Sequence, residues 1–264
     1  MTSGFWAQGD TYERYVGRWS RKVAPRFLAW LDAAPGMRWL DVGCGTGALC
    51  GAILEHGSPA AVTGVEPSAG FLSTAKERLG NAVTLLPGDA SAVPLDAACV
   101  DVVVSGLVLN FVPDPSAALR EMKRVAVGGG TIACYVWDYT NGMELMRHFW
   151  DVAVELDPRG RAIDESVRFP LCSPGPLAQL FTGAGLGNVA VEAIVTPTPF
   201  RDFDDYWQPF LGGQGPAPAY AMSLDESSRS RLRDRIRERL PVAADGSIAL
   251  TARAWAVRGV AGSK

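Results

Sequence analysis

The chain has 264 residues, of which 48% are hydrophobic, and its formal net charge is −3. This composition can form a sizeable core and excludes a largely disordered chain, and without a basic excess a dedicated nucleic-acid binder is disfavoured. The sequence has no apolar run long enough to span a membrane, no signal-peptide pattern in its first ten residues and no C-x-x-C pair among its five cysteines, so we expect a cytoplasmic protein with reduced thiols and no metal site.

The amino-terminal half begins with a mostly helical pattern at 11–32, which carries Tyr12, Tyr15 and Trp19 at helix-like spacing. From residue 37 on, short apolar runs alternate with helical patterns. Strands are predicted at 37–42, 60–66, 82–90, 100–111 and 129–139, and helices at 46–57, 68–80 and 115–126. Apolar strands that alternate with helices predict a parallel sheet covered on both faces.

After Tyr139 the pattern changes to more helices between fewer strands. Helices are predicted at 142–157, 174–186, 202–213 and 224–240, strands at 189–200 and 247–259, and a Gly/Pro-rich link at 212–220. We interpret the extra helices as a cap over the carboxyl edge of the sheet. The expected organisation is a single domain, 1–264, with a helical lid at 1–36, a core at 37–138 and cap helices at about 140–185 and 200–241.

The segment RWLDVGCGTGALC, residues 38–50, runs an apolar strand into Asp41 and then places Gly43, Gly45 and Gly47 within five residues. Open parallel sheets bind ligands outside the carboxyl ends of their strands, where such a loop precedes a helix. Glycine permits positive φ and has no Cβ, so a ligand can lie directly on the backbone. The pattern therefore predicts a ligand site here, with a tight turn that binds nothing as the alternative.

The residues around this loop indicate the kind of ligand. The spacing is G-x-G-x-G, whereas the dinucleotide fingerprint is G-x-G-x-x-G. Asp41 and Glu66 end the first two strands without a basic residue nearby, which suits a ligand with a positive centre. Glu66 follows Gly43 by 66 − 43 = 23 positions, the spacing of an acid that binds a ribose diol. We expect an adenosine-containing ligand without a pyrophosphate.

Four motifs in order, LDVGCGTG, the acid of VTGVEPS, GDASAVPLDAACVDVVVS and LVLNFVPDPSAALREMKRVAVGGG, resemble the class I S-adenosylmethionine-dependent methyltransferases over Arg38 to Asp138. The resemblance is greatest to the small-molecule group of the ubiquinone/menaquinone-biosynthesis type. It implies an α/β fold, a doubly wound Rossmann-like seven-stranded sheet that is mostly parallel with one antiparallel strand. It also implies S-adenosylmethionine as the cofactor and S-adenosylhomocysteine as its product.

The resemblance also implies roles for the first two strand ends. Asp41 would anchor the loop and reach the amino-acid end of the cofactor through water. Gly43, Cys44 and Gly45 would present backbone to the methionine part. Glu66 would accept hydrogen bonds from both ribose hydroxyls.

Further roles follow for the adenine. Pro67 or Ser68 would flank the ring, Asp89 would accept a hydrogen bond from the exocyclic amine, and Ala90 would offer its N–H to a ring nitrogen. Asp89 could instead only cap the turn after Gly88.

At the sulfonium side, Ser105 and Leu107 would line the site, although Ser105 could be a satisfied core hydroxyl. Asn110 stands where many relatives have histidine, which leaves the presence of a base there open. Tyr15 and Arg18 would reach the cofactor carboxylate, although Tyr12, Tyr15 and Trp19 could instead form only a packing stripe.

The expected chemistry is an in-line methyl transfer to a small molecule, in which the protein aligns the reactants and excludes water. A general base is required only for a protonated nucleophile, and His148 is a weak candidate. Aromatic residues of the second half form either an acceptor pocket or the packed core of the cap. They are Trp137, Tyr139, Phe149, Trp150, Phe200, Phe203, Tyr206, Trp207 and Phe210.

Three other functions remain to be compared with methyl transfer to a small molecule. A protein that binds S-adenosylmethionine or S-adenosylhomocysteine without transfer activity fits the same motifs, because methyl transfer needs few obligatory side chains. An NAD-type oxidoreductase would need the G-x-G-x-x-G turn that is missing. Methylation of protein or RNA would favour an N-P-P-Y motif or a basic groove, and neither is present. We therefore expect a small-molecule acceptor and neither a nucleic acid nor a membrane as partner.

Overall fold

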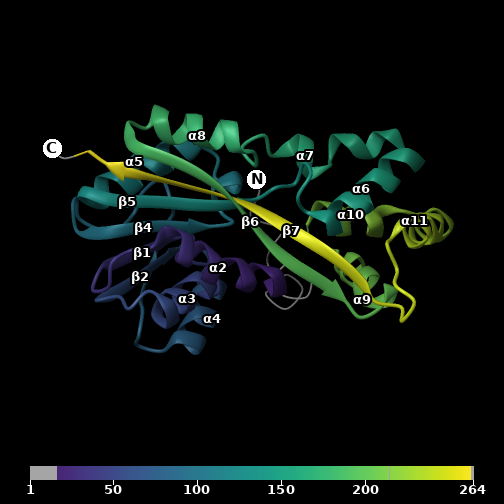
Figure 1. The fold of residues 1–264 in the computed structure, drawn as a ribbon, viewed down its shortest axis with the longest axis horizontal. Helices are drawn as coiled ribbons and strands as arrows, with labels where there is room; N and C mark the ends of the chain where they lie inside the picture. The colour runs from purple at the N-terminus through teal and green to yellow at the C-terminus, as the bar shows by residue number, and fades with distance from the viewer. Residues whose placement is uncertain (1–16, 214, 263–264) are drawn as a thin grey trace. The chain divides into compact units, whose positions relative to one another are not determined.

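The computed structural model describes residues 17–213 and 215–262 and divides the chain into two compact units (Figure 1). The first, here called the sheet unit, comprises Ser20–Val136, Ser173–Ile194 and Ala254–Lys264. The second, here called the helical unit, comprises Met1–Trp19, Trp137–Cys172 and Val195–Arg253. The expectation of a single domain stays a prediction.

The sheet has seven strands in the order β3-β2-β1-β4-β5-β7-β6. The strands are β1 (Arg38–Val42), β2 (Ala61–Glu66), β3 (Thr84–Pro87), β4 (Val100–Gly106), β5 (Ala126–Trp137), β6 (Leu186–Phe200) and β7 (Ile248–Ala261). The pairs among β1 to β5 are parallel, and β7 runs opposite to β6, as the arrowheads in Figure 1 show. The predicted fold class is confirmed.

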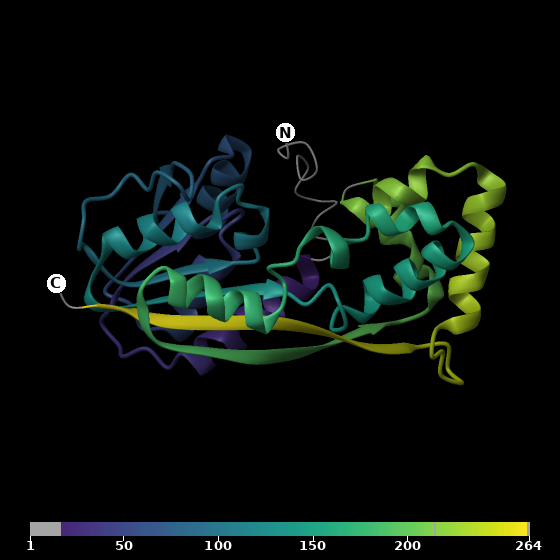
Figure 2. The same ribbon diagram turned by 90° about the horizontal axis from the view of Figure 1, so that it is seen from above.

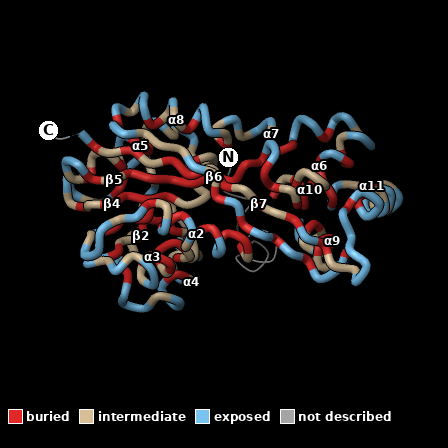
Figure 3. Tube along the Cα trace, in the orientation of Figure 1, coloured by how far each residue is buried: buried red, intermediate tan, exposed pale blue. Residues whose placement is uncertain are grey.

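Helices cover both faces of the strands in the sheet unit. They are α2 (Arg18–Leu31), α3 (Ala48–His56), α4 (Ala69–Leu79), α5 (Pro115–Val125), α8 (Pro174–Gly183) and the short η2 (Leu109–Phe111). Figures 1 and 2 show α5 and α8 on one face and α2, α3 and α4 on the other. Because both faces are covered, β1 and β4 are almost continuously apolar and buried, which Figure 3 shows as red tube.

The register of the central strands brings three polar residues to one edge. β1 lies between β2 and β4, and Asp41 is paired with Gly64 on one side and Val104 on the other. Glu66 lies two positions after Gly64 on β2, and Ser105 lies one position after Val104 on β4. Chain order also reverses between β1 and β4, the switch point at which open α/β sheets bind ligands.

The helical unit is built around aromatic side chains. Its elements are α6 (Glu144–Leu156), η3 (Pro158–Ala162), α7 (Glu165–Arg168), α9 (Phe203–Trp207), η4 (Gln208–Gly212), α10 (Pro216–Ser223) and α11 (Glu226–Arg239). Phe149 stacks on Phe210 with ring centroids 4.5 Å apart, and the Tyr206 hydroxyl donates to the carbonyl of Leu145. The nine aromatic residues singled out in the sequence are all at most 5% exposed. Core packing therefore explains this cluster.

Some predicted boundaries were wrong. The link at 212–220 contains α10, which starts at Pro216, because proline suits the first turn of a helix as well as a loop. The strand predicted at 100–111 ends at Gly106, since Leu107 has a φ of 61° and breaks the extended run. The short η3 and α7 were not predicted.

The predicted cap range 140–185 divides at Cys172, because α8 belongs to the sheet unit. In the part of the chain that the structure describes, no helix is both long and apolar enough to cross a bilayer.

Candidate functional site

The glycine loop after β1 is tied to the end of β2. The N–H groups of Gly43 and Cys44 both donate to the carbonyl of Val65, at 2.8 and 3.0 Å, and the N–H of Gly45 donates to Oε2 of Glu66. The predicted presentation of Gly43 and Cys44 to a ligand is therefore limited to their other backbone atoms, since both N–H groups are used. These hydrogen bonds hold the backbone of the loop in a defined conformation.

The three glycines are required for different reasons. All have positive φ, between 53° and 81°. A Cβ on Gly43 would lie 2.7 Å from Val108 Cγ1, and one on Gly47 would lie 2.5 Å from Leu79 Cδ1, so these two glycines permit close packing. A Cβ on Gly45 would meet nothing within 4 Å. The open side of the loop is thus at Gly45, where a ligand could approach the backbone.

Asp41 is a buried carboxylate with an unused oxygen. It is 1% exposed, the Cys50 thiol donates to its Oδ2 at 3.3 Å, and its Oδ1 has no hydrogen-bond partner among the described residues. Burial raises the pKa of Asp41 to about 7, and the nearby charge of Glu66 adds to that shift. An unsatisfied buried acceptor costs free energy, so a hydrogen-bond donor or a cation that bound at Oδ1 would be favoured.

Glu66 has two oxygens held by the backbone. Oε2 accepts from the Gly45 N–H at 3.1 Å and Oε1 from the Ser68 N–H at 2.9 Å. The residue is 7% exposed, and its pKa is raised by burial. The two backbone hydrogen bonds oppose this rise and offset part of it. A carboxylate has about four acceptor positions, so each oxygen can still accept one more hydrogen bond. That capacity matches the two hydroxyls of a ribose.

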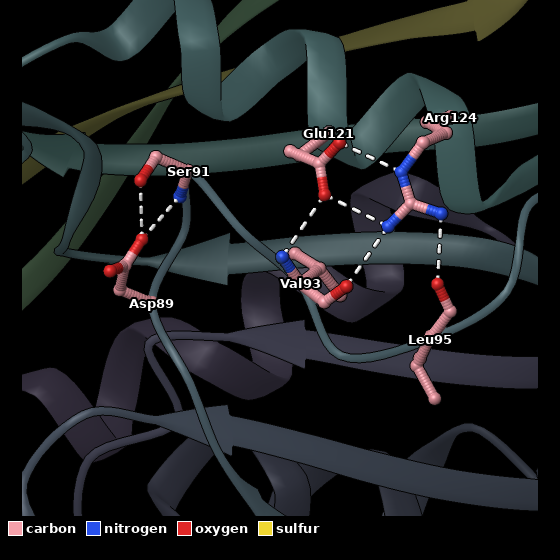
Figure 4. Close-up of polar contacts among 6 residues, drawn as sticks. All are labelled: Asp89, Ser91, Val93, Leu95, Glu121 and Arg124. Atoms are coloured by element: carbon pink, nitrogen blue, oxygen red, sulfur yellow. Dashed lines mark hydrogen bonds and ion pairs between the residues drawn. The ribbon is translucent and has the colours of Figure 1, made fainter.

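The predicted adenine side lies in the turn after β3. Oδ1 of Asp89 accepts from both the N–H and the hydroxyl of Ser91, at 2.7 and 2.6 Å, and these bonds lower the pKa of the exposed Asp89 (Figure 4). Asp89 therefore does cap its turn, as the alternative supposed. Because both bonds fall on Oδ1, Oδ2 lies outside that turn and can accept from a ligand. Ala90 lies within the same turn.

The residues predicted to flank the adenine lie where β2 passes into α4. Pro67 is exposed directly after Glu66. The Ser68 hydroxyl accepts from the Phe71 N–H at 3.4 Å and caps α4, as the sequence predicted. Ser68 thus serves the helix with its side chain and Glu66 with its N–H.

At the end of β4, the Ser105 hydroxyl is 2% exposed and donates to the carbonyl of Val42 at 2.8 Å. This bond satisfies the hydroxyl within the sheet, so the packing interpretation accounts for it. Asn110 differs, because its Nδ2 is buried and has no partner within 17–213 and 215–262. In the sequence, Asn110 is notable only because many relatives have histidine at that position.

The structure does not test the roles predicted for Tyr15 and Arg18. Tyr15 is outside the described residues. Arg18 belongs to the helical unit, where its Nη1 donates to Oδ1 of Asp205 at 2.9 Å and its guanidinium lies 4.8 Å from the centre of the Phe200 ring. Its contact with a cofactor carboxylate stays a prediction.

His148 also lies in the helical unit, on α6, and burial lowers its pKa. This shift favours the neutral imidazole, the form that a base needs, but the catalytic role of His148 stays a prediction. Described residues of the helical unit, Trp207 among them, line a pocket of about 300 Å³, and others line a pocket of about 350 Å³.

Residues 40–134 match the model of a methyltransferase domain. Demethylmenaquinone methyltransferase of Staphylococcus aureus is 41% identical over 112 residues, which are 41% of this chain and 46% of the relative. Malonyl-[acyl-carrier protein] O-methyltransferase of Serratia marcescens is 38% identical over 112 residues, 42% of this chain and 43% of the relative. The chain thus spans less than half the length of these relatives, and the expected resemblance is confirmed over that stretch.

Among solved structures, phosphoethanolamine N-methyltransferase 2 of Haemonchus contortus, solved with S-adenosyl-L-methionine, matches with a TM-score of 0.57 and 16% identity. The match covers all of this chain and 58% of that one. At this identity it shows that the fold is shared.

Proposed function

Because residues 40–134 match a methyltransferase domain, we propose that the chain binds S-adenosylmethionine at the carboxyl edge of its sheet unit and transfers the methyl group to a small molecule. The observation that carries the proposal is the arrangement of Asp41, Gly45 and Glu66. Two buried carboxylates flank an open glycine, and within the described ranges no ion pair reaches either acid. This edge suits a cationic ligand with a diol.

The residues present fit this cofactor. Glu66 would accept the two ribose hydroxyls on the acceptor positions that Gly45 and Ser68 leave free. Asp41 would use its unpartnered Oδ1 for the amino-acid end, through water. Asp89 would accept from the adenine amine on Oδ2.

When bound, the cofactor supplies a methyl carbon that its sulfonium charge already activates. The protein contributes alignment and exclusion of water, which in well-oriented reactions is worth about 7–11 kcal/mol. Gly43 and Cys44, fixed to Val65, hold the loop rigid, so little ordering is needed when the cofactor binds. The carboxylates of Asp41 and Glu66 anchor the cofactor and take no part in proton transfer.

The proposal names the methyl acceptor only by its chemical class, a small molecule. The two relatives differ in the acceptor that their names state, although each matches this chain over 112 residues to a similar degree. The shared stretch therefore supports the cofactor site, while acceptor selection depends on the rest of each chain. We propose a small molecule, because the sequence shows neither the motif nor the charge expected for polymer substrates.

Calorimetric titration with S-adenosylmethionine, S-adenosylhomocysteine and NAD tests the binding step. We expect binding of the first two and none of NAD. Tight binding of NAD instead would support the oxidoreductase alternative and overturn the proposal.

Transfer of a labelled methyl group to a panel of small molecules tests the second step. Label in at least one acceptor is expected. Binding without transfer to any acceptor in a broad panel of phenols, amines and carboxylates would favour the alternative of a cofactor-binding protein.

A further inference from the structure

The segment between β3 and β4 carries Asp89 and Ala90, which are proposed to contact the adenine. It contains no helix and only an isolated bridge between Asp89 and Ala92. A loop of this kind holds one conformation only if other groups fix its backbone, because each residue ordered costs about 1–2 kcal/mol of conformational entropy. Side chains of α5 supply those groups.

Glu121 and Arg124, one turn apart on α5, bind the loop through its backbone (Figure 4). Arg124 donates from Nη1 to the carbonyl of Leu95 at 2.8 Å and from Nη2 to the carbonyl of Val93 at 2.9 Å. Oε2 of Glu121 accepts from the N–H of Val93 at 3.0 Å. The two side chains are also joined to each other, at 2.7 and 2.8 Å.

This network fixes Val93 from both sides, since its N–H and its carbonyl are both held. Val93 is 4% exposed, and its neighbour Ala92 donates to the carbonyl of Asp89 at 3.2 Å. Pro94 packs against Gly88, where a Cβ would lie 2.8 Å from Pro94 Cδ. The pair of Glu121 and Arg124, here called the clamp, holds Val93, and three residues of backbone connect Val93 to Asp89.

We propose that Glu121 and Arg124 are positioning residues for adenine recognition, which hold the loop so that the free oxygen of Asp89 meets the exocyclic amine. The inference rests on the proposed function, because it concerns the adenine end of that site. Neither side chain contacts the ligand: all their described hydrogen bonds go to the loop backbone and to each other.

The clamp persists at neutral pH. The hydrogen bonds with Arg124 lower the pKa of Glu121, and Glu121 raises the pKa of Arg124, so both stay charged. Arg124 uses its planar fork on a carboxylate and two carbonyls at once, a geometry that the single ammonium of lysine reproduces only in part.

The test compares S-adenosylhomocysteine with S-inosylhomocysteine, in which a carbonyl replaces the exocyclic amine. By calorimetry, the wild type should bind the adenosyl form at least about tenfold more tightly, because the inosyl form leaves Asp89 without its donor. In Arg124→Gln the ratio should fall to about threefold or less, with little change for the inosyl form. Arg124→Lys should restore part of the ratio.

A matched control exists in the same unit. Arg38 donates to Asp101 from Nε and Nη2, at 2.9 and 2.8 Å, at the amino end of β1. Arg38→Gln removes an arginine–carboxylate pair at the opposite edge and should leave the ratio at its wild-type value. Should Arg124→Gln fail to fold, Glu121→Gln carries the same comparison.

The possible outcomes separate the two proposals. A folded clamp variant with the wild-type ratio overturns the positioning role. A wild type that binds both compounds equally also overturns it and leaves the proposed function standing. A wild type that binds neither compound overturns the proposed function itself.

Discussion

The two units treat their buried carboxylates differently. In the helical unit, Asp138 is paired with Arg253 at 2.8 Å and Asp164 with Arg147 at 2.7 Å, and both acids are at most 5% exposed. In the sheet unit, Asp41 and Glu66 are also buried, at 1% and 7% exposed, but among the described residues they accept hydrogen bonds only from a thiol and from backbone N–H groups.

This difference distinguishes buried acids that stabilise the fold from buried acids that are proposed to bind a ligand. A buried acid with an arginine partner is neutralised within the fold, and removing one partner leaves an uncompensated charge. A buried acid without a cationic partner can instead be stabilised by a donor or a cation that binds from outside. Under the proposed function a bound ligand would supply that partner to Asp41 and Glu66, whereas Arg253 and Arg147 already supply it to Asp138 and Asp164.

Glu165 on α7 is the exception in the helical unit. It is 2% exposed, and burial raises its pKa to about 7. The Trp150 indole N–H donates to Oε2, while Oε1 has no partner in the described part of the chain. Its raised pKa and its unpartnered oxygen resemble those of Asp41, but Glu165 lies on the short helix α7 rather than at the end of a strand.

Replacing Glu66 by alanine should have the largest effect on binding. It removes the proposed acceptors of both ribose hydroxyls, and charged hydrogen bonds are worth about 1.5–3 kcal/mol each, so affinity for S-adenosylhomocysteine should fall by about 100-fold or more. Calorimetry measures the loss. Asp164→Asn, an equally buried acid with an arginine partner, should lower Tm and leave Kd within about twofold; equal losses in both variants would break the comparison.

Gly45→Ala and Gly43→Ala should separate binding from folding. Both glycines have positive φ, which strains alanine by about 1 kcal/mol. Only Gly43 also has Val108 in the way, so Gly43→Ala should lower Tm more. Gly45→Ala should fold but bind the cofactor about tenfold or more weakly, because its methyl group projects into the open side of the loop. Thermal melts and titrations of the two variants measure both effects, and a Gly45→Ala protein with normal affinity would contradict a ligand at this place.

Cofactor affinity should rise with pH because of Asp41. Its folded pKa of about 7 is above its ordinary value of 3.8, so its contribution to stability is present below pH 4 and is lost as pH rises through 7. A cationic ligand favours the ionised form, so affinity should increase about tenfold between pH 5 and 8 if binding lowers the pKa by about one unit. Asp41→Asn should flatten this profile, apart from what Glu66 contributes. A steep profile in that variant would assign the effect to another group.

Glu165→Gln should have the smallest effect, on stability alone. In the wild type the neutral carboxyl stabilises the fold below about pH 4.5, and this contribution is lost as pH rises through about 7. One pH unit corresponds to about 1.4 kcal/mol, or a few degrees of Tm for a chain of this size. The amide should remove that loss between pH 6 and 8 while Kd for the cofactor stays unchanged. A changed Kd would show that Glu165 belongs with Asp41 rather than with the structural acids.

Local sequence determined most of the sheet unit. The apolar run of β1, the Ser68 cap, the stop at Gly80 and the glycines with positive φ were all predicted, because each depends on residues within a few positions. The ends of β1 and β2 also follow from sequence, and with parallel pairing they place Asp41 and Glu66 at one edge.

Only tertiary structure decided which donors reach those acids and which stay unpaired. Cys50 meets Asp41 because α3 folds back on β1, and Arg124 meets a loop 29 to 31 positions earlier in the chain because α5 packs beside it. The burial of Glu165 and the role of the aromatic cluster as core were equally beyond local pattern. The physical reason is range: propensities, caps and φ preferences act over one turn, whereas hydrogen-bond partners and burial depend on segments that meet only after the chain has folded.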